Sequence, residues 1–144
     1  MVKEIRGDII KLFKAGNFDA IIHICNCCHD FDQNELSKQI KSNFIKALKV
    51  DEQKTLFGDY QKLGSFSVCI VDSKKIINLY THIFPGANTE YAALVKGLHR
   101  INKHYRGKQL AINQITKNAT QWMIMSRIIK NLLVDVDLTI VYDS

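Results

Sequence analysis

The sequence predicts an α/β fold, a three-layer α/β/α domain with a mostly parallel central sheet. Apolar stretches typical of strands alternate along the chain with amphipathic stretches typical of helices, which is the order found in parallel α/β proteins. The run DAIIHIC at 19–25 is almost continuously apolar, as expected of a strand that is buried on both faces. No repeat, low-complexity stretch or linker interrupts the 144 residues, so residues 1–144 are expected to form a single domain.

The first half of the chain is expected to hold four strands and one long helix. In order, the expected elements are a strand at Val2–Ile5, an apolar turn at Ile9–Phe13, a strand at Asp19–Cys25, a helix at Glu35–Leu48, and strands at Ser65–Val71 and Lys75–Tyr80 around a turn at Asp72 and Ser73. The helix is indicated by apolar residues at helical spacing, which are Leu36, Ile40, Phe44, Ala47 and Leu48.

The second half predicts two helices, each followed by a strand. The expected elements are a helix at Thr89–Tyr105, a strand at Leu110–Ile115, a helix at Trp122–Leu133 and a strand at Leu138–Tyr142. In such sheets, ligands bind beyond the carboxyl ends of the parallel strands. The loops expected there are polar and comprise Asn26–Asn34, Thr81–Asn88 and Asn113–Gln121. The candidate ligand site therefore lies at these three loops.

Composition narrows the class of protein. A hydrophobic content of 47% with one proline indicates a globular chain rather than a disordered one. No apolar run approaches the ~20 residues of a membrane span, and the N-terminus MVKEIRGDII carries charges where a signal peptide has its apolar core. These observations favour a cytoplasmic location, in the host cytoplasm if a phage encodes the chain, and no membrane partner.

The net charge of +6, from 20 basic and 14 acidic residues, suits an anionic ligand. Two groups of basic residues fall at near-helical spacing, namely Lys38, Lys41 and Lys46, and Lys96, Arg100, Lys103 and His104. Solvated helix faces are the favoured interpretation of this spacing. A nucleic-acid partner is the alternative.

The four cysteines favour a reducing compartment. Cys27 and Cys28 are neighbours in the sequence, which is poor geometry for a disulfide. Cys25 and the nearby His23 and His29 would add ligands for zinc, but a second paired cluster at finger-like spacing is missing from the sequence. Structural thiols are therefore favoured over a metal site, and no cofactor is expected.

Two motifs stand out, which are IRGDIIKL at 5–12 and FDAIIHICNC at 18–27. They resemble the entry motif and the next buried strand of the macro domains, which bind ADP-ribose and its derivatives, as seen for the second motif in phage and bacterial members of that family. GDYQKLGSFSV, IINLYTH and the final W…SRIIKNLL…VDLTIVY resemble further stretches of the same branch. The resemblance runs along the whole chain and implies the macro-domain fold.

The resemblance also implies roles for particular residues. Asp8 matches the Asp that accepts a hydrogen bond from the adenine amino group, with the backbone of Ile9 beside it, and Asn26 matches a polar residue near the distal ribose. Tyr142 stands where the last strand emerges near the adenine pocket. The alternatives are that Asp8 caps the following helical turn and that Tyr142 is an ordinary strand aromatic.

Both loops that usually bind phosphate depart from the family pattern. The first, CHDFDQNELSKQI at 28–40, has no glycine, and Asp30, Asp32 and Glu35 stand where a diphosphate would approach. In the second, an alignment on Trp122 puts Asn113 at the strand residue. The usual glycine positions then fall on Gln114, Thr116, Ala119 and Thr120. Positive φ at such residues costs about 1 kcal/mol each, so this loop is expected to follow another path or to bind through its side chains.

The catalytic groups of the related hydrolases, which remove ADP-ribose from DNA, are replaced as well. His82 stands where that branch has a lysine, and Asn118 stands where it has an aspartate. Imidazole cannot replace an amine that forms a Schiff base, and an amide cannot act as a general base. His29 and His82 are favoured as polar pocket or surface residues over acid or base roles. We therefore expect no catalytic residue.

Three functions follow from these observations. The favoured one is an inactive macro-like binder of an ADP-ribose-derived or related nucleotide, such as a phage sponge that counters host defence by sequestering a nucleotide immune signal. The alternatives are an ADP-ribosyl hydrolase or phosphatase with altered catalytic groups, and an interaction module for protein or nucleic acid. The residues expected to contact the ligand are Asp8, Ile9, Asn26, His29, Thr81, His82, Gln114, Thr116, Lys117, Asn118, Thr120 and Tyr142.

Overall fold

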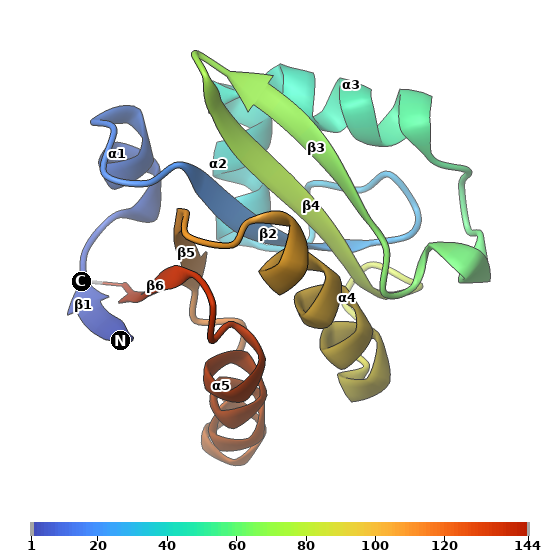
Figure 1. The fold of residues 1–144 in the computed structure, drawn as a ribbon. Coiled ribbons are helices and arrows are strands. Elements are labelled where there is room, and N and C mark those ends of the chain that lie inside the picture. Colours follow the sequence, from blue (N-terminus) through green and yellow to red (C-terminus); the bar gives the residue numbers. More distant parts are fainter. Residues whose placement is uncertain (1, 144) are drawn as a thin grey trace.

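A six-stranded sheet runs through the centre of the computed structural model, which describes residues 2–143 (Figure 1). The strands are β1 (Lys3–Arg6), β2 (Ala20–Asn26), β3 (Phe66–Val71), β4 (Lys74–His82), β5 (Gln109–Asn113) and β6 (Asp137–Tyr142). Their order in the sheet is β1-β6-β5-β2-β4-β3, and only the β3–β4 pair among them is antiparallel. The predicted α/β fold with a mostly parallel sheet is therefore confirmed.

Helices cover both faces of this sheet and produce the expected three layers (Figure 1). They are α1 (Ile9–Lys14), α2 (Glu35–Asn43), α3 (Ile45–Lys54), α4 (Tyr91–His104) and α5 (Ala119–Leu132), with a short 3-10 helix η1 (Tyr60–Lys62). The first three pack into one core cluster with Ile21 and Tyr80, while α4 and α5 pack into a second cluster with Ile22 and Leu79. No helix among residues 2–143 is long and apolar enough to cross a membrane.

Several predicted boundaries are wrong. The single helix expected at Glu35–Leu48 is two helices, because Phe44 leaves the helical conformation with φ −140° and ψ 67°. Its ring packs edge-on against Phe13, with 5.5 Å between the ring centroids. The second helix continues to Lys54, beyond the predicted end.

Two other elements also begin or end differently from the prediction. Helix α5 begins at Ala119 rather than at Trp122, because the Asn118 side chain caps it by accepting a hydrogen bond from the Gln121 N–H. The apolar turn expected at Ile9–Phe13 is the helix α1, which Asp8 caps. Both differences arise from capping side chains that lie one residue before the first helical position.

Polar side chains enter the core on the face covered by α2 and α3. His23 lies opposite Asn78 in the β2–β4 pair, and both side chains are buried. Cys25 and Tyr80 lie two residues further along the same two strands and face the same way, because alternate residues of a strand share a face. This face of the sheet therefore carries a polar network under the loop that follows β2.

Candidate functional site

A cleft of about 360 Å³ lies at the carboxyl-end edge of the parallel strands, where the sequence predicted a ligand site. All three predicted loops contribute to it. Its lining comprises Ile22, His23, Ile24, Gln33, Asn34, Glu35, Leu36, His82, Gly86, Ala87, Asn88, Thr89, Asn113, Gln114, Ile115, Thr116, Lys117, Gln121, Met125 and Asp143. The volume falls within the range of small-molecule sites.

Three helices begin beside this cleft. The cleft wall includes Glu35 at the start of α2, Thr89 just before α4, and Gln121 in the first turn of α5. The N-terminus of a helix carries partial positive charge and free N–H groups, which attract anions. Asparagine side chains cap α2 and α5, whereas no side chain caps α4. The helix ends therefore favour an anionic ligand.

His82 connects two of the cleft loops. Its Nε2 lies 2.9 Å from Gln33 Oε1 and its Nδ1 lies 2.9 Å from Thr81 Oγ1. Burial lowers the pKa of His82 to about 4, so the imidazole is neutral at pH 7 and carries one N–H. Because Gln33 Oε1 only accepts, Nε2 donates to it, and Nδ1 accepts from the Thr81 hydroxyl. Both ring nitrogens are therefore occupied.

The loop Asn113–Gln121 is held by its own side chains. Gln114 Nε2 donates to the carbonyl of Thr116 at 2.9 Å, and the Asn118 N–H donates to Thr116 Oγ1 at 3.2 Å. None of residues 113–121 has a positive φ. The loop therefore lacks the backbone conformation that favours glycine, in keeping with the first of the two alternatives expected for it. Ligand binding by its side chains stays a prediction.

Asn113, which lines the cleft, has a buried acceptor without a partner. Its side-chain Oδ1 is buried and has no hydrogen-bond partner among residues 2–143, whereas its Nδ2 donates to Asp143 Oδ1 at 3.5 Å. Among the residues that line the cleft, Lys117 is the only lysine or arginine, and Glu35 and Asp143 carry the only carboxylates. A buried oxygen without a donor is unfavourable, so a ligand N–H or O–H at this position would relieve that penalty.

The predicted gathering of three carboxylates at the first loop is correct only for Glu35. The Asp32 carboxylate pairs with Lys41 at 3.0 Å, and the Asp30 carboxylate accepts from the Asp32 N–H at 2.7 Å. Neither side chain lines the cleft. The repulsion expected for a diphosphate is consequently weaker than the sequence suggested.

The side chain of Asn26 forms hydrogen bonds within its own loop rather than facing the cleft. The side chain is 1% exposed, its Oδ1 accepts from the Cys28 N–H at 2.9 Å, and its Nδ2 donates to the carbonyl of Asp30 at 2.8 Å. These bonds fix the turn after β2. A direct ribose contact through this side chain would have to replace them.

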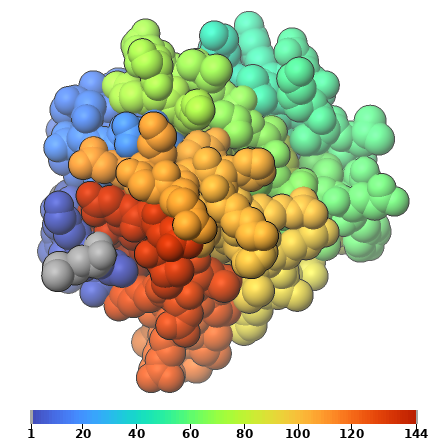
Figure 2. Space-filling view, in the orientation of Figure 1, coloured from blue at the N-terminus to red at the C-terminus, as the bar shows by residue number. Residues whose placement is uncertain are grey.

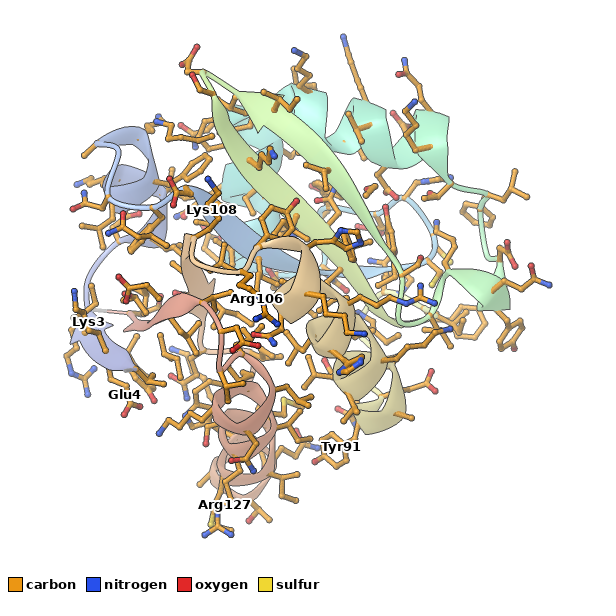
Figure 3. The ribbon with its side chains drawn as sticks, viewed as in Figure 1. Lys3, Glu4, Tyr91, Arg106, Lys108 and Arg127 are labelled. Carbon is orange, nitrogen blue, oxygen red and sulfur yellow. The ribbon has the colours of Figure 1, made fainter. Side chains whose placement is uncertain are left out.

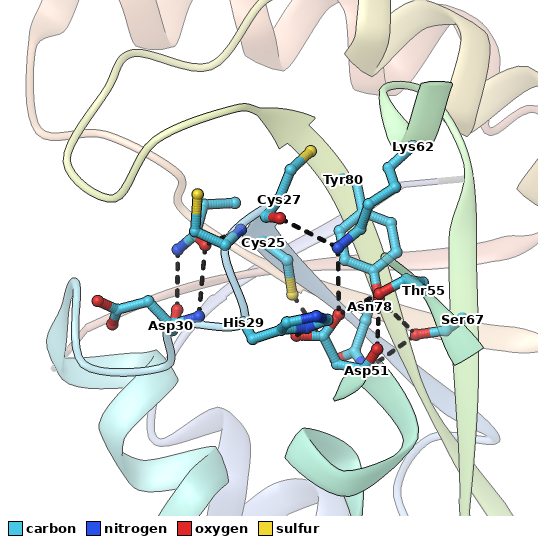
Figure 4. A network of polar contacts seen from close by, with 12 residues as sticks. Cys25, Cys27, His29, Asp30, Asp51, Thr55, Lys62, Ser67, Asn78 and Tyr80 are labelled. Atoms are coloured by element: carbon cyan, nitrogen blue, oxygen red, sulfur yellow. Dashed lines mark hydrogen bonds and ion pairs between the residues drawn. The ribbon is translucent and has the colours of Figure 1, made fainter. Parts of the chain in front are cut away.

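The loop after β2 is anchored to a buried carboxylate that the sequence did not indicate (Figure 4). Asp51, on α3, is fully buried and accepts from Tyr80 Oη at 2.6 Å and from Thr55 Oγ1 at 3.1 Å. Its Oδ2 lies 3.2 Å from His29 Nδ1 without hydrogen-bond alignment, so this contact is an ion pair when the imidazole is protonated. A charged residue on a helix is normally exposed, and the sequence therefore gave no sign of this network.

Lys62 completes the anchor. Its ammonium lies 3.9 Å from Asp51 Oδ1 and donates to the carbonyl of Cys27 at 3.2 Å, and its side chain is 4% exposed. Its ammonium also lies 4.8 Å from the centre of the Tyr80 ring. Through these contacts, α3 and η1 fix the loop that carries His29, which has a left-handed φ of 54°.

The thiols and His23 belong to the same buried region. His23 lies 3.0 Å from Asn78 Oδ1 and 2.8 Å from Ser37 Oγ, and burial lowers its pKa to about 4. Burial raises the pKa of the Cys25 and Cys27 thiols, which therefore stay protonated at pH 7. No group of three or more His, Cys, Asp or Glu residues within 2–143 is arranged to hold a metal ion.

The predicted adenine residues lie together but outside the lining of the cleft. Asp8 Oδ1 accepts from the N–H groups of Ile10 and Lys11, as a helix cap, and Ile9 is buried in the core. Tyr142 donates to Glu4 Oε1 at 2.7 Å. The Gly7 N–H donates to the Tyr142 carbonyl, which brings Asp8 to the end of β6, next to the Asp143 of the cleft.

Of the twelve residues predicted to contact a ligand, the cleft brings four together, and these are His82, Gln114, Thr116 and Lys117. The Thr81 hydroxyl is hydrogen-bonded to Nδ1 of His82. Asn118 caps α5, and Thr120 is exposed in the first turn of that helix. The cleft lining also includes Gln33, Asn113 and Asp143, which were not predicted to contact a ligand, although Gln33 and Asn113 lie in loops that were predicted to form the site.

The comparisons with known proteins agree on the fold. No family model matches the sequence. The chain is 38% identical, over 112 residues, to an uncharacterized 17.5 kDa protein from the tk-vs intergenic region of Enterobacteria phage T4, which covers 75% of this chain and 70% of that protein. The macrodomain of Thermus aquaticus DarG superposes with a TM-score of 0.76 at 14% identity and covers 97% of both chains.

A second solved structure, Thermosipho africanus DarTG in complex with ADP-ribose, superposes with a TM-score of 0.70 at 13% identity. The match covers 88% of this chain and 38% of that one, so it corresponds to part of the longer protein. The chain therefore has the macrodomain fold and belongs to the same family as the 17.5 kDa protein of phage T4.

Proposed function

We propose that this protein binds an ADP-ribose-derived or related nucleotide in the cleft and leaves it chemically unchanged. The observation that carries this proposal is the convergence of three helix N-termini on one polar cleft at the carboxyl edge of the sheet. The neighbour DarTG, which has a similar fold, was solved in complex with ADP-ribose. That similarity supports a nucleotide ligand of this kind.

The cleft suggests how such a ligand would lie. Its phosphate groups would meet the N-terminus of α4 and the Lys117 ammonium, and a ribose hydroxyl would donate to Asn113 Oδ1. The base would extend past Asp143 toward Asp8. Because Asp8 Oδ1 already caps α1, the adenine amino group would donate to Oδ2 of that carboxylate.

The binding role is favoured over hydrolysis because the two histidines of the lining, His23 and His82, are both buried and hydrogen-bonded at both ring nitrogens. His82 is neutral, buried, and hydrogen-bonded at both ring nitrogens, so proton transfer would require the Gln33 and Thr81 contacts to break. A binder without turnover acts stoichiometrically. The relative in phage T4 motivates the finer proposal that such a protein sequesters a nucleotide immune signal in the host cytoplasm.

Calorimetric titration with ADP-ribose, and with its cyclic and conjugated derivatives, tests this proposal. We expect one ligand to bind per chain and chromatography of the mixture to recover it intact after hours with excess protein. Lys117→Gln should weaken binding at least about tenfold, because a charge-assisted hydrogen bond contributes about 1.5–3 kcal/mol. Lys108→Gln, at an exposed lysine outside the cleft, should leave the affinity unchanged.

Two outcomes would overturn the proposal. If none of these nucleotides binds and mass spectrometry finds no nucleotide on the purified protein, the cleft has another role. If ADP-ribosyl substrates are consumed and His82→Gln abolishes the turnover, the protein is a hydrolase that uses altered groups.

A further inference from the structure

The positive charge of this protein is concentrated in one segment. Residues 91–134 contain eight lysines and arginines and no aspartate or glutamate, whereas the rest of the chain contains twelve basic and fourteen acidic residues. The segment therefore carries a formal charge of +8 and the remainder carries −2. The net charge of +6 for the whole chain does not show this asymmetry.

The segment also occupies one side of the molecule. It comprises α4, β5 and α5, and the two helices pack together over the same face of the sheet (Figure 1). In the space-filling view, the yellow-orange to red residues form a continuous part of the surface in view (Figure 2). Among its cations, Arg106 and Lys108 are labelled between the end of α4 and β5, and Arg127 is labelled on α5 (Figure 3).

A row of cations follows the outer face of α4. Lys96, Arg100 and Lys103 are exposed and are spaced four and three residues apart, which places them on one side of the helix. Arg106 and Lys108 are exposed and continue the row past the end of the helix. At 1.5 Å per residue, Lys96 and Lys103 are separated by roughly 10 Å along the helix axis.

Lys96 and Arg100 are explained neither by the stability of the helix nor by internal ion pairs. Basic residues in the last turn of a helix are favourable, which accounts for Lys103 but not for Lys96 and Arg100 nearer its middle. Like charges four residues apart, as in that pair, destabilise a helix. Among residues 2–143, the ion pairs of the segment are Arg106 with Asp135 at 3.4 Å and Lys130 with Glu4 at 3.3 Å.

We propose that this basic row, defined as Lys96, Arg100, Lys103, Arg106 and Lys108, binds the phosphate backbone of a nucleic acid. A strand of DNA carries one phosphate per about 3.4 Å of its axis, so the roughly 10 Å between Lys96 and Lys103 correspond to about three phosphates. Lysine and arginine side chains on one exposed helix face are the groups that contact such a backbone. None of the five lines the cleft, so this surface is separate from the nucleotide site.

Fluorescence anisotropy with a labelled 20-base-pair DNA of arbitrary sequence tests this surface, with single-stranded DNA and RNA of the same length in parallel. We expect binding at low salt, with log K falling linearly against log salt for at least one of these nucleic acids. The triple variant Arg100→Gln, Lys103→Gln, Lys108→Gln should reduce the magnitude of that slope by about 2.7 for duplex DNA, at 0.9 for each lost phosphate contact.

The matched control changes three exposed lysines on the opposite layer, Lys38→Gln, Lys46→Gln and Lys49→Gln, which alters the net charge equally. This control should keep the slope of the unmodified protein. An equal loss of slope in both triple variants would show that only the net charge attracts the nucleic acid. That result would overturn the proposal, and so would the absence of binding by the unmodified protein at low salt.

Discussion

The two glycine-free loops beside the cleft are held in different ways. The loop Asn26–Asn34 is anchored from outside, because His29 and the carbonyl of Cys27 contact Asp51 and Lys62, which come from α3 and η1. The loop Asn113–Gln121 is held from within by hydrogen bonds among Gln114, Thr116, Asn118 and Gln121. One loop thus depends on distant buried charges, and the other depends on near neighbours in the sequence.

This difference shows that two kinds of contact replace glycine. His29 has the left-handed φ that favours glycine, and its Nδ1 lies 3.2 Å from a buried carboxylate. The loop Asn113–Gln121 avoids positive φ altogether. Substitutions should therefore destabilise the first loop through the core of the protein and the second loop only locally.

Asp51→Asn should have the largest effect. The substitution keeps the shape of the side chain but leaves Lys62 as a buried ammonium without its counter-ion, and breaking such a pair costs about 3–5 kcal/mol. We expect the free energy of unfolding, measured by urea denaturation at pH 7.5, to fall by that amount. Asp32→Asn removes a half-exposed pair with Lys41 and should change it by less than about 1 kcal/mol.

A double-mutant cycle sharpens this test. If Asp51 and Lys62 interact as described, Lys62→Met combined with Asp51→Asn should destabilise the protein less than the sum of the two single changes. Additive effects would show that the carboxylate and the ammonium contribute independently, and the loop would then not be anchored by charge.

Acid should destabilise the protein between pH 6.5 and pH 4. The folded pKa values of His23 and His82 are about 4, below the ordinary value of about 6.5, so the unfolded chain takes up these two protons first as the pH falls. The neutral imidazoles therefore add stability that is complete above pH 6.5 and is lost toward pH 4. This contribution amounts to up to about 3 kcal/mol for each.

Urea denaturation at a series of pH values measures this loss. His82→Gln removes one of the two titrations, so the variant should lose about half as much stability as the unmodified protein over the same range. A free energy of unfolding that stays constant from pH 7 to pH 4.5 would contradict the description of both imidazoles as buried and neutral.

Two substitutions of His29 distinguish the cost of its left-handed conformation from the loss of its contact with Asp51. At φ 54°, an alanine side chain costs about 1–2 kcal/mol relative to glycine. Both His29→Ala and His29→Gly lose the contact with Asp51, but the glycine variant should be more stable by that amount in urea denaturation. If the two variants are equally stable, the loop leaves its left-handed conformation once the imidazole is removed.

Asn118→Ala should have the smallest effect. The change removes the side-chain acceptor of the Gln121 N–H at the start of α5, which costs about 1 kcal/mol. Thermal unfolding should show a correspondingly small decrease in Tm. Asn118→Asp, which keeps the acceptor, should restore the stability, and a failure to do so would mean that the amide N–H₂ has a role as well.

Much of the fold was predictable because its signals are local. The apolar run that forms β2 was expected at Asp19–Cys25 and occupies Ala20–Asn26. The break at Phe44 was not, because the apolar spacing continues across it and the interruption depends on packing against Phe13, a residue far away in the sequence. Periodicity reports which residues face the core and not where a helix bends.

The candidate site was predictable at the level of loops and only partly at the level of side chains. The rule that ligands bind at the carboxyl edge of a parallel sheet located all three loops. The direction of each side chain depends on partners in the folded state, however. Asn26 faces its own loop, whereas Asn113 lines the cleft and has a buried oxygen without a donor.

The pairing of β1 with β6 has a consequence for the order in which the protein folds. Lys3 lies beside Thr139, so the first strand pairs with the last one, and β1 has no other neighbour in the sheet. During synthesis, β1 therefore stays unpaired until the residues up to Tyr142 have left the ribosome. Its four residues are all exposed even in the folded protein and include both charge signs, a composition that discourages pairing with other chains during that interval.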